Sequence, residues 1–336
     1  MLLPLYQKNF VPLHQKKETV QSFSIHIKRY EKTDSPIWDD FVDNAKNGTF
    51  LFKRAYMDYH AYRFEDFSLL IFENKKLVAL LPANRNEKIV YSHQGLTYGS
   101  LLISATVSQR LMLAIFDELN LFLKPLGVEK LYYKTVPAIY HKLPCEEDLY
   151  ALFRHHAKLV VRNCSTTFDI QKSKTSPKLR STRISKCIEK HNLRYEIHSD
   201  VNAFWSIVEE NLKQKYGVAP VHSQAEINLL QSSFPHNIQA IAVFSGDKIV
   251  AGAVVYLAND VAHLQYVAVS SEGEKMYACE FLYDLFVHHL YLNFRYFDFG
   301  ISTENSGQVL NEGLIAYKEK FGGNTTVYDH YELLLQ

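Results

Sequence analysis

The most informative pattern of apolar and polar positions lies near the carboxyl end of the chain. Residues 296–299, Tyr-Phe-Asp-Phe, form an aromatic run typical of a buried strand, and Gly300 lets the backbone turn sharply out of it. Polar side chains then fill residues 302–305, at the end of the predicted strand, where open α/β sheets tend to place their ligands. From Val309 onward apolar residues recur at helical spacing, and the glycine pair 322–323 ends that helix. The stretch therefore predicts a strand, a site-bearing turn and a helix.

The same order of elements occurs twice along the chain. Residues 72–79 align without gaps with residues 244–251, and each segment is typical of a strand, a tight turn and a second strand. A short strand, an apolar helix and an aromatic strand follow in both halves, at 91–94, 111–122 and 131–133 in the first and at 262–266, 281–289 and 296–299 in the second. Four elements repeated in one order indicate a duplicated α/β unit.

This repeat predicts an α/β (α+β) fold with two similar halves. We expect an N-terminal arm at residues 1–22, a first domain at 23–171, a basic connecting helix at 172–198 and a second domain at 199–336. A chain of 336 residues is long for a single core, which agrees with two domains. The end of the second domain, residues 325–335, is rich in Val, Tyr and Leu and predicts a terminal strand.

Composition limits the classes of function. The 37 basic and 36 acidic residues leave the chain close to neutral, so no overall field attracts nucleic acid or a membrane. No stretch approaches the roughly 20 apolar residues that cross a bilayer. The four cysteines have neither zinc-ligand nor disulfide-framework spacing. We therefore expect a cytoplasmic protein without a membrane span or a metal site; the pattern leaves its oligomeric state open.

Three motifs near the carboxyl end resemble those of the Fem-type peptidyltransferases and their tandem-GNAT acyltransferase relatives. They are Phe297-Asp298-Phe299-Gly300, Leu310-Asn311-x-Gly313-Leu314 and Tyr317-Lys318-x-x-Phe321-Gly322-Gly323. Resemblance to this FemAB/FemX-like superfamily implies two GNAT-like halves, each a mixed, mostly antiparallel twisted sheet flanked by helices. It also implies acyl transfer to an amino sugar or a related cell-envelope precursor of polysaccharide biosynthesis, with a nucleotide- or lipid-linked sugar as the expected acceptor.

Transfer of an activated acyl group requires that the enzyme align the attacking group, remove its proton and stabilise an oxyanion, and it needs no covalent enzyme intermediate. Glu304 and His263 are the candidate bases. The resemblance implies that Tyr317 and Lys318 meet the acyl donor, where Lys318 could neutralise the oxyanion. Asp298 interrupts an apolar strand and therefore needs a partner.

Two histidines have a functional and a structural interpretation. Strict alternation along residues 262–268 puts His263, Gln265 and every second residue on one polar face, at the point where a GNAT sheet opens for its donor. A buried histidine satisfied by a neighbour is the alternative. His222 precedes a capping box at residues 223–226, and its imidazole could bind substrate or move a proton, or serve only packing.

A basic run between the halves, residues 172–194, has eight Lys and Arg residues against one acidic residue. A solvated connecting helix is one interpretation. The resemblance implies instead that Arg180 and Arg183 hold phosphates of the acceptor, because a guanidinium group pairs with two oxygens at once. Lys53, in a segment that we expect to be a loop at the edge of a cleft, and Asn311, within the matching motif, are further candidates for substrate binding.

The turn after the strand at 262–268 bears on the acyl donor. Residues 270–278 keep one glycine, Gly273, of the phosphate-binding loop that acetyl-coenzyme A enzymes of this type carry at a helix start. An acyl-coenzyme A donor is expected, with Gly273 and Lys275 as contacts. Aminoacyl-tRNA is the alternative donor, although no heptad-rich insertion provides an arm for it. A non-catalytic binding protein for a nucleotide-linked precursor is the alternative class.

Overall fold

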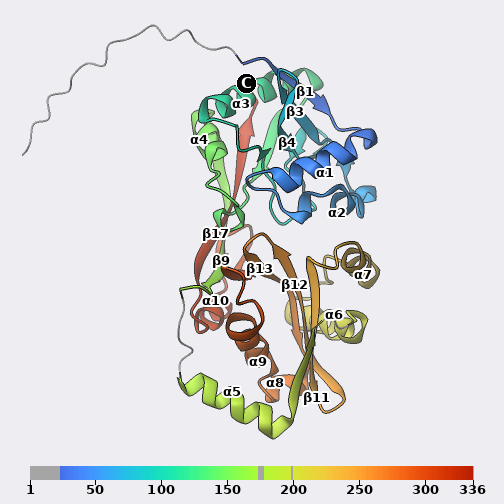
Figure 1. The fold of residues 1–336 in the computed structure, drawn as a ribbon, viewed down its shortest axis with the longest axis vertical. Coiled ribbons are helices and arrows are strands. Elements are labelled where there is room, and N and C mark those ends of the chain that lie inside the picture. Colours follow the sequence, from blue (N-terminus) through green and yellow to red (C-terminus); the bar gives the residue numbers. More distant parts are fainter. Residues whose placement is uncertain (1–22, 173–177, 198–199, 336) are drawn as a thin grey trace, which may run out of the picture.

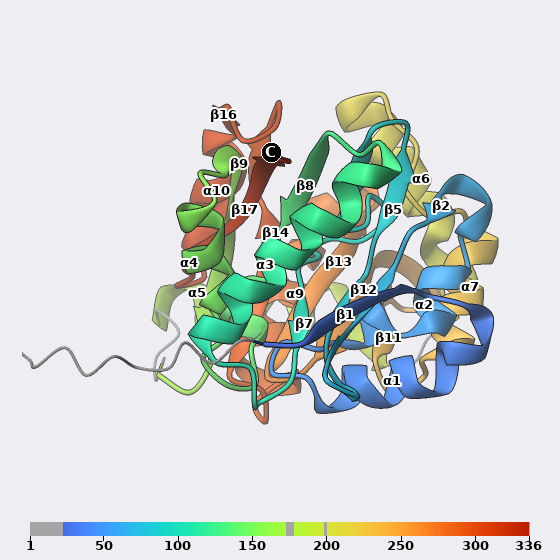
Figure 2. The ribbon, with the colours of Figure 1, turned by 90° about the horizontal axis from the view of Figure 1, so that it is seen from above.

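The computed structural model describes residues 23–172, 178–197 and 200–335, without the side chains of residues 178–181 and 215–216. The predicted arm at residues 1–22 lies outside the described residues. Figure 1 shows the first half of the chain above the second along the long axis. Helices α1, α2, α6 and α7 lie along one side of the molecule, and α4, α5 and α10 lie along the other (Figure 1 and Figure 2).

The first half begins with a strand and ends with a long one. Its strands are β1 (Ile25–Arg29), β2 (Glu65–Asp66), β3 (Leu69–Glu73), β4 (Lys76–Leu81), β5 (Asn84–Asn86), β6 (Ile89–Tyr91), β7 (Leu102–Ile103), β8 (Lys130–Lys134) and β9 (Lys158–Asp169). Its helices are α1 (Ser35–Asn44), α2 (Arg54–Asp58), α3 (Gln109–Leu123) and α4 (Glu147–Arg154).

The second half repeats this order. Its strands are β10 (Leu193–Ile197), β11 (Ile238–Ser245), β12 (Lys248–Ala258), β13 (Val261–Val269), β14 (Tyr296–Ile301), β15 (Thr303–Glu304), β16 (Val309–Leu310) and β17 (Asn324–Leu334). Its helices are α5 (Lys178–His191), α6 (Asn202–Tyr216), α7 (Gln224–Ser233), α8 (Ser271–Lys275), α9 (Ala278–Leu285) and α10 (Glu312–Glu319).

The strands form mixed, mostly antiparallel sheets, as predicted. A four-stranded sheet has the order β1-β3-β4-β7, and an eleven-stranded sheet has the order β10-β11-β12-β13-β14-β9-β17-β8-β6-β5-β2. Among the described residues the parallel neighbours are β6 with β8 in the first half and β13 with β14 in the second. Each half therefore has one parallel pair at the equivalent place.

The aligned hairpins confirm the duplication in detail. Strands β3 and β4 pair antiparallel in the first half, as β11 and β12 do in the second. The register of the first hairpin shifts between Ile71 and Phe72, and that of the second shifts between Val243 and Phe244. These positions are equivalent in the gap-free alignment of residues 72–79 with 244–251. A bulge kept at one position in both copies is a feature that hydrophobic periodicity alone does not produce.

The halves are joined by an exchange of their last strands. Strand β9, which ends the first half, pairs with β14 of the second half. Strand β17, which ends the second half, pairs with β8 of the first half and along most of its length with β9. The two copies thus share one continuous sheet, and residues of both reach its centre.

Apolar packing and ion pairs also hold the halves together. The ring of Phe50 lies 5.4 Å from that of Phe234 and 5.5 Å from that of Tyr256 in a shared core. At the surface the Arg63 guanidinium pairs with the Glu226 carboxylate. The segment around Phe50 is therefore a buried turn rather than the loop at a cleft edge that the sequence predicted.

Two helix boundaries differ from the prediction. The helix expected from Val309 onward begins at Glu312, because residues 309–310 pair with residues 303–304 as strands β16 and β15. In the basic segment, α5 ends at His191, and the residues that follow form the edge strand β10 instead of continuing the helix.

Close packing of α6 on the sheet yields a stability prediction. A Cβ atom added at Gly252 of β12 would lie 2.2 Å from Cγ of the buried Phe204. We expect Gly252→Ala to lower the free energy of unfolding by roughly 1–3 kcal/mol, as overpacking does. Gly313→Ala on α10, where the nearest atom is 3.8 Å away, is the control and should leave the stability unchanged or higher. Chemical denaturation of both variants measures the difference, and equal midpoints would contradict this account.

Candidate functional site

A cavity lies where β13 and β14 separate. The two strands are paired in parallel only from Val261 with Tyr296 to His263 with Asp298. Beyond that point a cavity of about 580 Å³ opens between them, which we call the central cavity. Its walls come from both halves of the chain: Thr97, Asn163, Leu212, residues 263–267, Tyr283, residues 299–301, Leu314, Lys318, Tyr328 and His330.

A bulge in β13 shapes one wall of the central cavity. Val254 pairs with Tyr266 and Val255 pairs with Leu264, so Gln265 is the extra residue. The predicted strict alternation is therefore wrong, since the bulge moves Tyr266 to the face that carries His263. A bulged residue is left out of the ladder, and such residues often re-aim groups beside active sites. Gln265 lines the cavity at this point.

His263 and Asp298 form a pair at the narrow end of the cavity. Their Nδ1 and Oδ2 atoms are 2.8 Å apart. A carboxylate only accepts hydrogen bonds, so Nδ1 donates to Asp298, and in the neutral imidazole the lone pair is then on Nε2. Because His263 lines the cavity and Asp298 lies behind it, the pair can take a proton from a bound group. Asp298 thus has the partner that its place in an apolar strand requires.

Asp298 remains ionised although it is completely buried. Its side chain is 0% exposed, and it accepts hydrogen bonds from the hydroxyls of Ser165, Tyr140 and Tyr328 as well as from His263. Burial alone would raise the pKa of the carboxyl group, but the hydrogen bond and charge of His263, with those hydroxyls, hold the pKa well below its usual value. The negative charge therefore persists beside the imidazole at neutral pH.

Lys318 enters the central cavity from α10. Its side chain is only 4% exposed, and Nζ donates to the carbonyl oxygens of Gly300 at 2.8 Å and Ile301 at 2.9 Å. Burial lowers the pKa of Lys318 to about 8, while the charge of Asp298 acts in the opposite direction. Two ammonium hydrogens are used by these carbonyls, which leaves the third for an oxygen atom in the cavity.

A second cavity of about 350 Å³ adjoins the first. Both are lined by Leu212, Val267, Tyr283 and Leu314, so the two cavities lie side by side along β13. Tyr317 lines the second cavity and packs against Tyr283, with ring centroids 5.6 Å apart. The sequence-predicted pair of residues 317–318 is thus divided between neighbouring cavities.

The acidic and amide candidates at the turn before α10 bind each other. Glu304 is exposed on β15 and accepts a hydrogen bond from Asn311 Nδ2 at 2.9 Å. Asn311 also caps α10, where its Oδ1 accepts from the amide of Leu314. Neither residue lines the central cavity. Of the two candidate bases, His263 is therefore the one that the structure brings to Lys318.

His222 is buried against the wall of the cavity rather than open to it. Its Nδ1 lies 2.8 Å from the hydroxyl of Tyr266, and its ring stacks on Tyr59. Burial lowers the pKa of His222 to about 4, so the imidazole is neutral near pH 7. The predicted capping box that follows is confirmed, with Ser223 and Glu226 each bonded to the backbone of the other.

The basic candidates lie outside the central cavity. Lys53 donates to the carbonyl oxygen of Asp39 at 2.8 Å and pairs with Asp43. Arg183 stacks on the ring of Tyr277 and lines a different cavity with Lys320. The side chain of Arg180 lies outside the described residues. An anion site formed jointly by these groups is not present among the described side chains.

The turn predicted to hold a coenzyme has a packing role as well. A Cβ atom at Gly273 would lie 2.3 Å from the carbonyl oxygen of Val250, so only glycine lets α8 approach β12 this closely. The Gly273 amide is bonded to the hydroxyl of Ser270, which caps α8. Lys275 is exposed at the end of that helix. Among the described residues no group of three or more His, Cys, Asp or Glu could hold a metal ion.

In the part of the first half that the structure describes, the place equivalent to the His263–Asp298 pair is held by other residues. In its short parallel ladder the third pair is Tyr91 with Tyr132, which corresponds to His263 with Asp298 in the second half. The two tyrosine rings lie 5.4 Å apart. Among the described residues, only the second half therefore has an imidazole and a carboxylate at the third pair of its parallel ladder.

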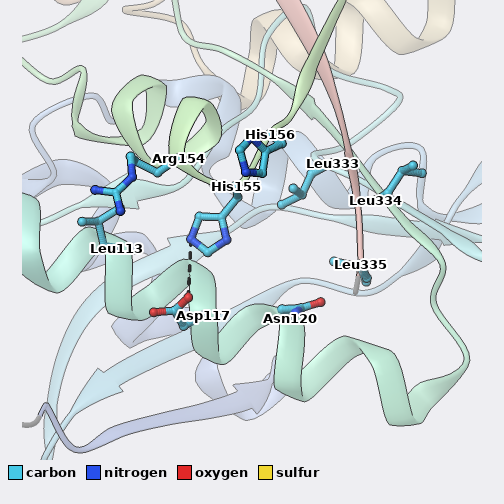
Figure 3. Close-up of a pocket in the computed structure, with 9 residues that line it drawn as sticks. All are labelled: Leu113, Asp117, Asn120, Arg154, His155, His156, Leu333, Leu334 and Leu335. Atoms are coloured by element: carbon cyan, nitrogen blue, oxygen red, sulfur yellow. Dashed lines mark ion pairs between the residues drawn. The ribbon is translucent and has the colours of Figure 1, made fainter.

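A separate cavity of about 380 Å³ lies at the far end of the first half. Figure 3 shows the imidazole of His155 directed toward Asp117 on α3, with Leu333 and Leu335 from the end of β17 nearby. The Nε2 and Oδ1 atoms of that pair are 3.6 Å apart. This cavity shares no lining residue with the central cavity, so it is not part of the same site.

Comparisons with known proteins agree with this geometry. The sequence model of the acetyltransferase (GNAT) domain family matches residues 178–319. Among solved structures, FemX has a TM-score of 0.66 at 9% identity and covers 92% of this chain and 97% of its own. L-PGS from Bacillus licheniformis has a TM-score of 0.59 at 13% identity, covering 90% of this chain and 91% of its own. The tandem GNAT protein from the clavulanic acid biosynthesis pathway has a TM-score of 0.51 at 11% identity, covering 93% and 99%.

The matched segment, residues 178–319, is accordingly a GNAT acyltransferase domain. The fold of the whole chain has the tandem arrangement of FemX, which confirms the resemblance drawn from the sequence. No curated protein matches the sequence. None of the helices among the described residues is both long and apolar enough to cross a membrane.

Proposed function

We propose that the protein transfers an acyl group from an activated donor to an amine of an amino sugar or a related precursor, in the central cavity. The observation that carries the proposal is the His263–Asp298 pair, which lies with Lys318 in one cavity at the opening of the GNAT-type sheet. A base, an ammonium group and a bulged strand around one space supply what acyl transfer requires.

The proposed reaction needs no covalent enzyme intermediate. As the nitrogen of the acceptor bonds to the acyl carbon, His263 Nε2 takes its proton and the carbonyl oxygen gains negative charge. Lys318 stabilises that oxyanion with its remaining hydrogen. When the intermediate collapses, the bond from carbon to the leaving thiolate breaks, and His263 returns the proton to sulfur. Asp298 stabilises the imidazolium in between.

A thioester of coenzyme A is the proposed donor, since GNAT domains generally bind acyl-coenzyme A. The second cavity lies beside the central one along β13, where the extended arm of the donor would end at the reacting carbonyl. A specific observation also favours an aminoacyl ester, as in Fem-type transfer from tRNA. Glu274 and Glu280 line the second cavity, and carboxylates there suit the ammonium group of an aminoacyl donor better than a pyrophosphate.

Ligand-dependent melting and thiol release test the proposal together. Acetyl-coenzyme A should raise the melting temperature by mass action, and adding glucosamine should then release free coenzyme A thiol. Stabilisation and thiol release support a coenzyme A donor. Stabilisation by an aminoacyl-adenosine analogue, without stabilisation by acetyl-coenzyme A, would indicate an aminoacyl donor instead of a coenzyme A thioester. Stabilisation by sugar nucleotides without any transfer would indicate a binding protein and contradict the proposed function.

The pKa of Lys318 predicts a pH dependence. Its ammonium form is the one that stabilises an oxyanion, and with a pKa of about 8 that form is lost as the pH rises. We expect kcat/KM to fall above about pH 8. In Lys318→Arg the cation persists, so the ratio of variant to wild-type kcat/KM should rise across pH 8 to 10, and ionisation of the acceptor cancels from that ratio. A ratio independent of pH would contradict the role of Lys318.

Lys134 provides the control for this experiment. Burial lowers its pKa to about 8 as well, and its Nζ donates to the carbonyl oxygens of Gln94 and Leu96 in the first half. Lys134 does not line the central cavity. Lys134→Met should therefore keep the alkaline fall of the wild-type profile.

A further inference from the structure

The buried carboxylate of the proposed site is held partly by the first half of the chain. Tyr140 ends a turn that follows β8, and its hydroxyl donates to Asp298 Oδ2 at 3.0 Å. The hydroxyl of Tyr328, on the exchanged strand β17, donates to the same oxygen at 2.5 Å. His263 Nδ1 is the third donor to Oδ2. Three groups from three separate parts of the chain thus compete for one oxygen atom.

Tyr140 is fixed in place by contacts that do not involve Asp298. Its ring packs 4.8 Å from that of Tyr98, and its carbonyl oxygen accepts a hydrogen bond from Asn259 at 2.7 Å. The side chain is completely buried. Burial and the neighbouring charge of Asp298 raise the pKa of Tyr140, so its hydroxyl stays protonated and can act only as a donor toward the carboxylate. A rigid donor of this kind fixes the position of the oxygen to which it is bonded.

We infer that Tyr140 is a positioning residue for the His263–Asp298 pair, so that the first half of the chain helps to set the orientation and basicity of the group that accepts the proton. The inference rests on the proposed function, in which His263 is the base. Each hydrogen bond to Oδ2 draws charge away from the others, as hydrogen bonds within one network are coupled. Removing the Tyr140 hydroxyl therefore strengthens the bond from His263 and changes how the imidazole is held. The Tyr140 hydroxyl therefore acts on the imidazole through Asp298 and needs no contact with the substrate.

Proton NMR of the free protein tests the inference without any substrate. The hydrogen on His263 Nδ1, buried against a carboxylate, should give a low-field signal that disappears in His263→Gln. In Tyr140→Phe this signal should move further downfield, because Oδ2 has lost a competing donor. Tyr98→Phe is the matched control: Tyr98 is equally buried beside Tyr140, but its hydroxyl lies 3.3 Å from Thr49 Oγ1 and makes no bond to Asp298. The signal should stay in place in Tyr98→Phe.

Kinetics of the same variants separate positioning from stability. Tyr140→Phe should lower kcat by up to about 100-fold at an unchanged KM, which is the effect of misplacing a reacting group. Tyr98→Phe should leave kcat and KM unchanged, and only its melting temperature should fall. If Tyr140→Phe does not fold, Tyr328→Phe removes another donor to the same oxygen and takes its place in both measurements.

An unmoved His263 signal in Tyr140→Phe, or an equal displacement in Tyr98→Phe, would overturn the inference. If the protein proves not to transfer acyl groups, the His263 signal can still be measured, because it is recorded in the protein alone. A displaced signal in a protein without acyl transfer would therefore support the positioning role of Tyr140 and contradict only the proposed reaction.

Discussion

Replacement of His263 by glutamine is expected to lower kcat for acyl transfer by about 100- to 10,000-fold, the usual contribution of a positioned general base. Glutamine keeps a hydrogen-bond donor that can face Asp298, so the buried carboxylate keeps a partner and the fold should persist. The measurement is release of coenzyme A thiol at saturating donor, together with the melting temperature of the variant.

The control for this variant is a histidine and aspartate pair elsewhere in the molecule. His155 pairs with Asp117 in the cavity of the first half, apart from the proposed site. His155→Gln removes an imidazole of similar burial and should leave turnover as it is in the wild type. Normal turnover in His263→Gln, or an equal loss in both variants, would refute the role given to His263.

Replacement of Lys318 by methionine is the second large effect that we expect. Loss of a preorganised group that stabilises an oxyanion costs about 100- to 1000-fold in kcat. Methionine keeps an unbranched apolar stem in the buried channel, whereas alanine would also leave a void. The change removes the donor to the carbonyl oxygens of Gly300 and Ile301, so some loss of stability should accompany the loss of rate.

Lys46→Met separates these two effects. Lys46 is also buried, and it pairs with Glu147 in the first half without lining the central cavity. We expect it to lose stability but to keep its turnover per folded molecule. A Lys318→Met enzyme whose turnover per folded molecule matches that of Lys46→Met would show that Lys318 only supports the fold.

Local patterns in the sequence predicted most of the elements because the signals for them are local. The helix near residues 111–122, the capping box at 223–226 and the terminal strand all follow from periodicity and from side chains a few positions apart. The duplication was also readable, since both copies keep the same hairpin. Motifs shared with a known family added the expectation of a tandem arrangement.

The proposed site was predictable only in part, because its decisive contacts join distant residues. The need of Asp298 for a partner followed from its apolar surroundings, and His263 was a candidate base, yet nothing local connects the two. Tyr140 and Asp298 are 158 positions apart, and only the folded sheet brings them together. The bulge at Gln265 has no signal in the alternation of polar and apolar residues, and this one extra residue reverses the faces that strict alternation predicts.

The exchange of end strands has a consequence for how the chain acquires its structure during synthesis. Strand β8 of the first half pairs with β6 on one side, and its neighbour on the other side is β17, which comes after every other described strand in the chain. Until β17 is made, the β8 edge of the strands β8-β6-β5-β2 stays open, and open edges can pair with other chains. We therefore expect the first half to complete its sheet only after β17 has left the ribosome, and nascent chains stalled before β17 to depend on chaperones for their solubility.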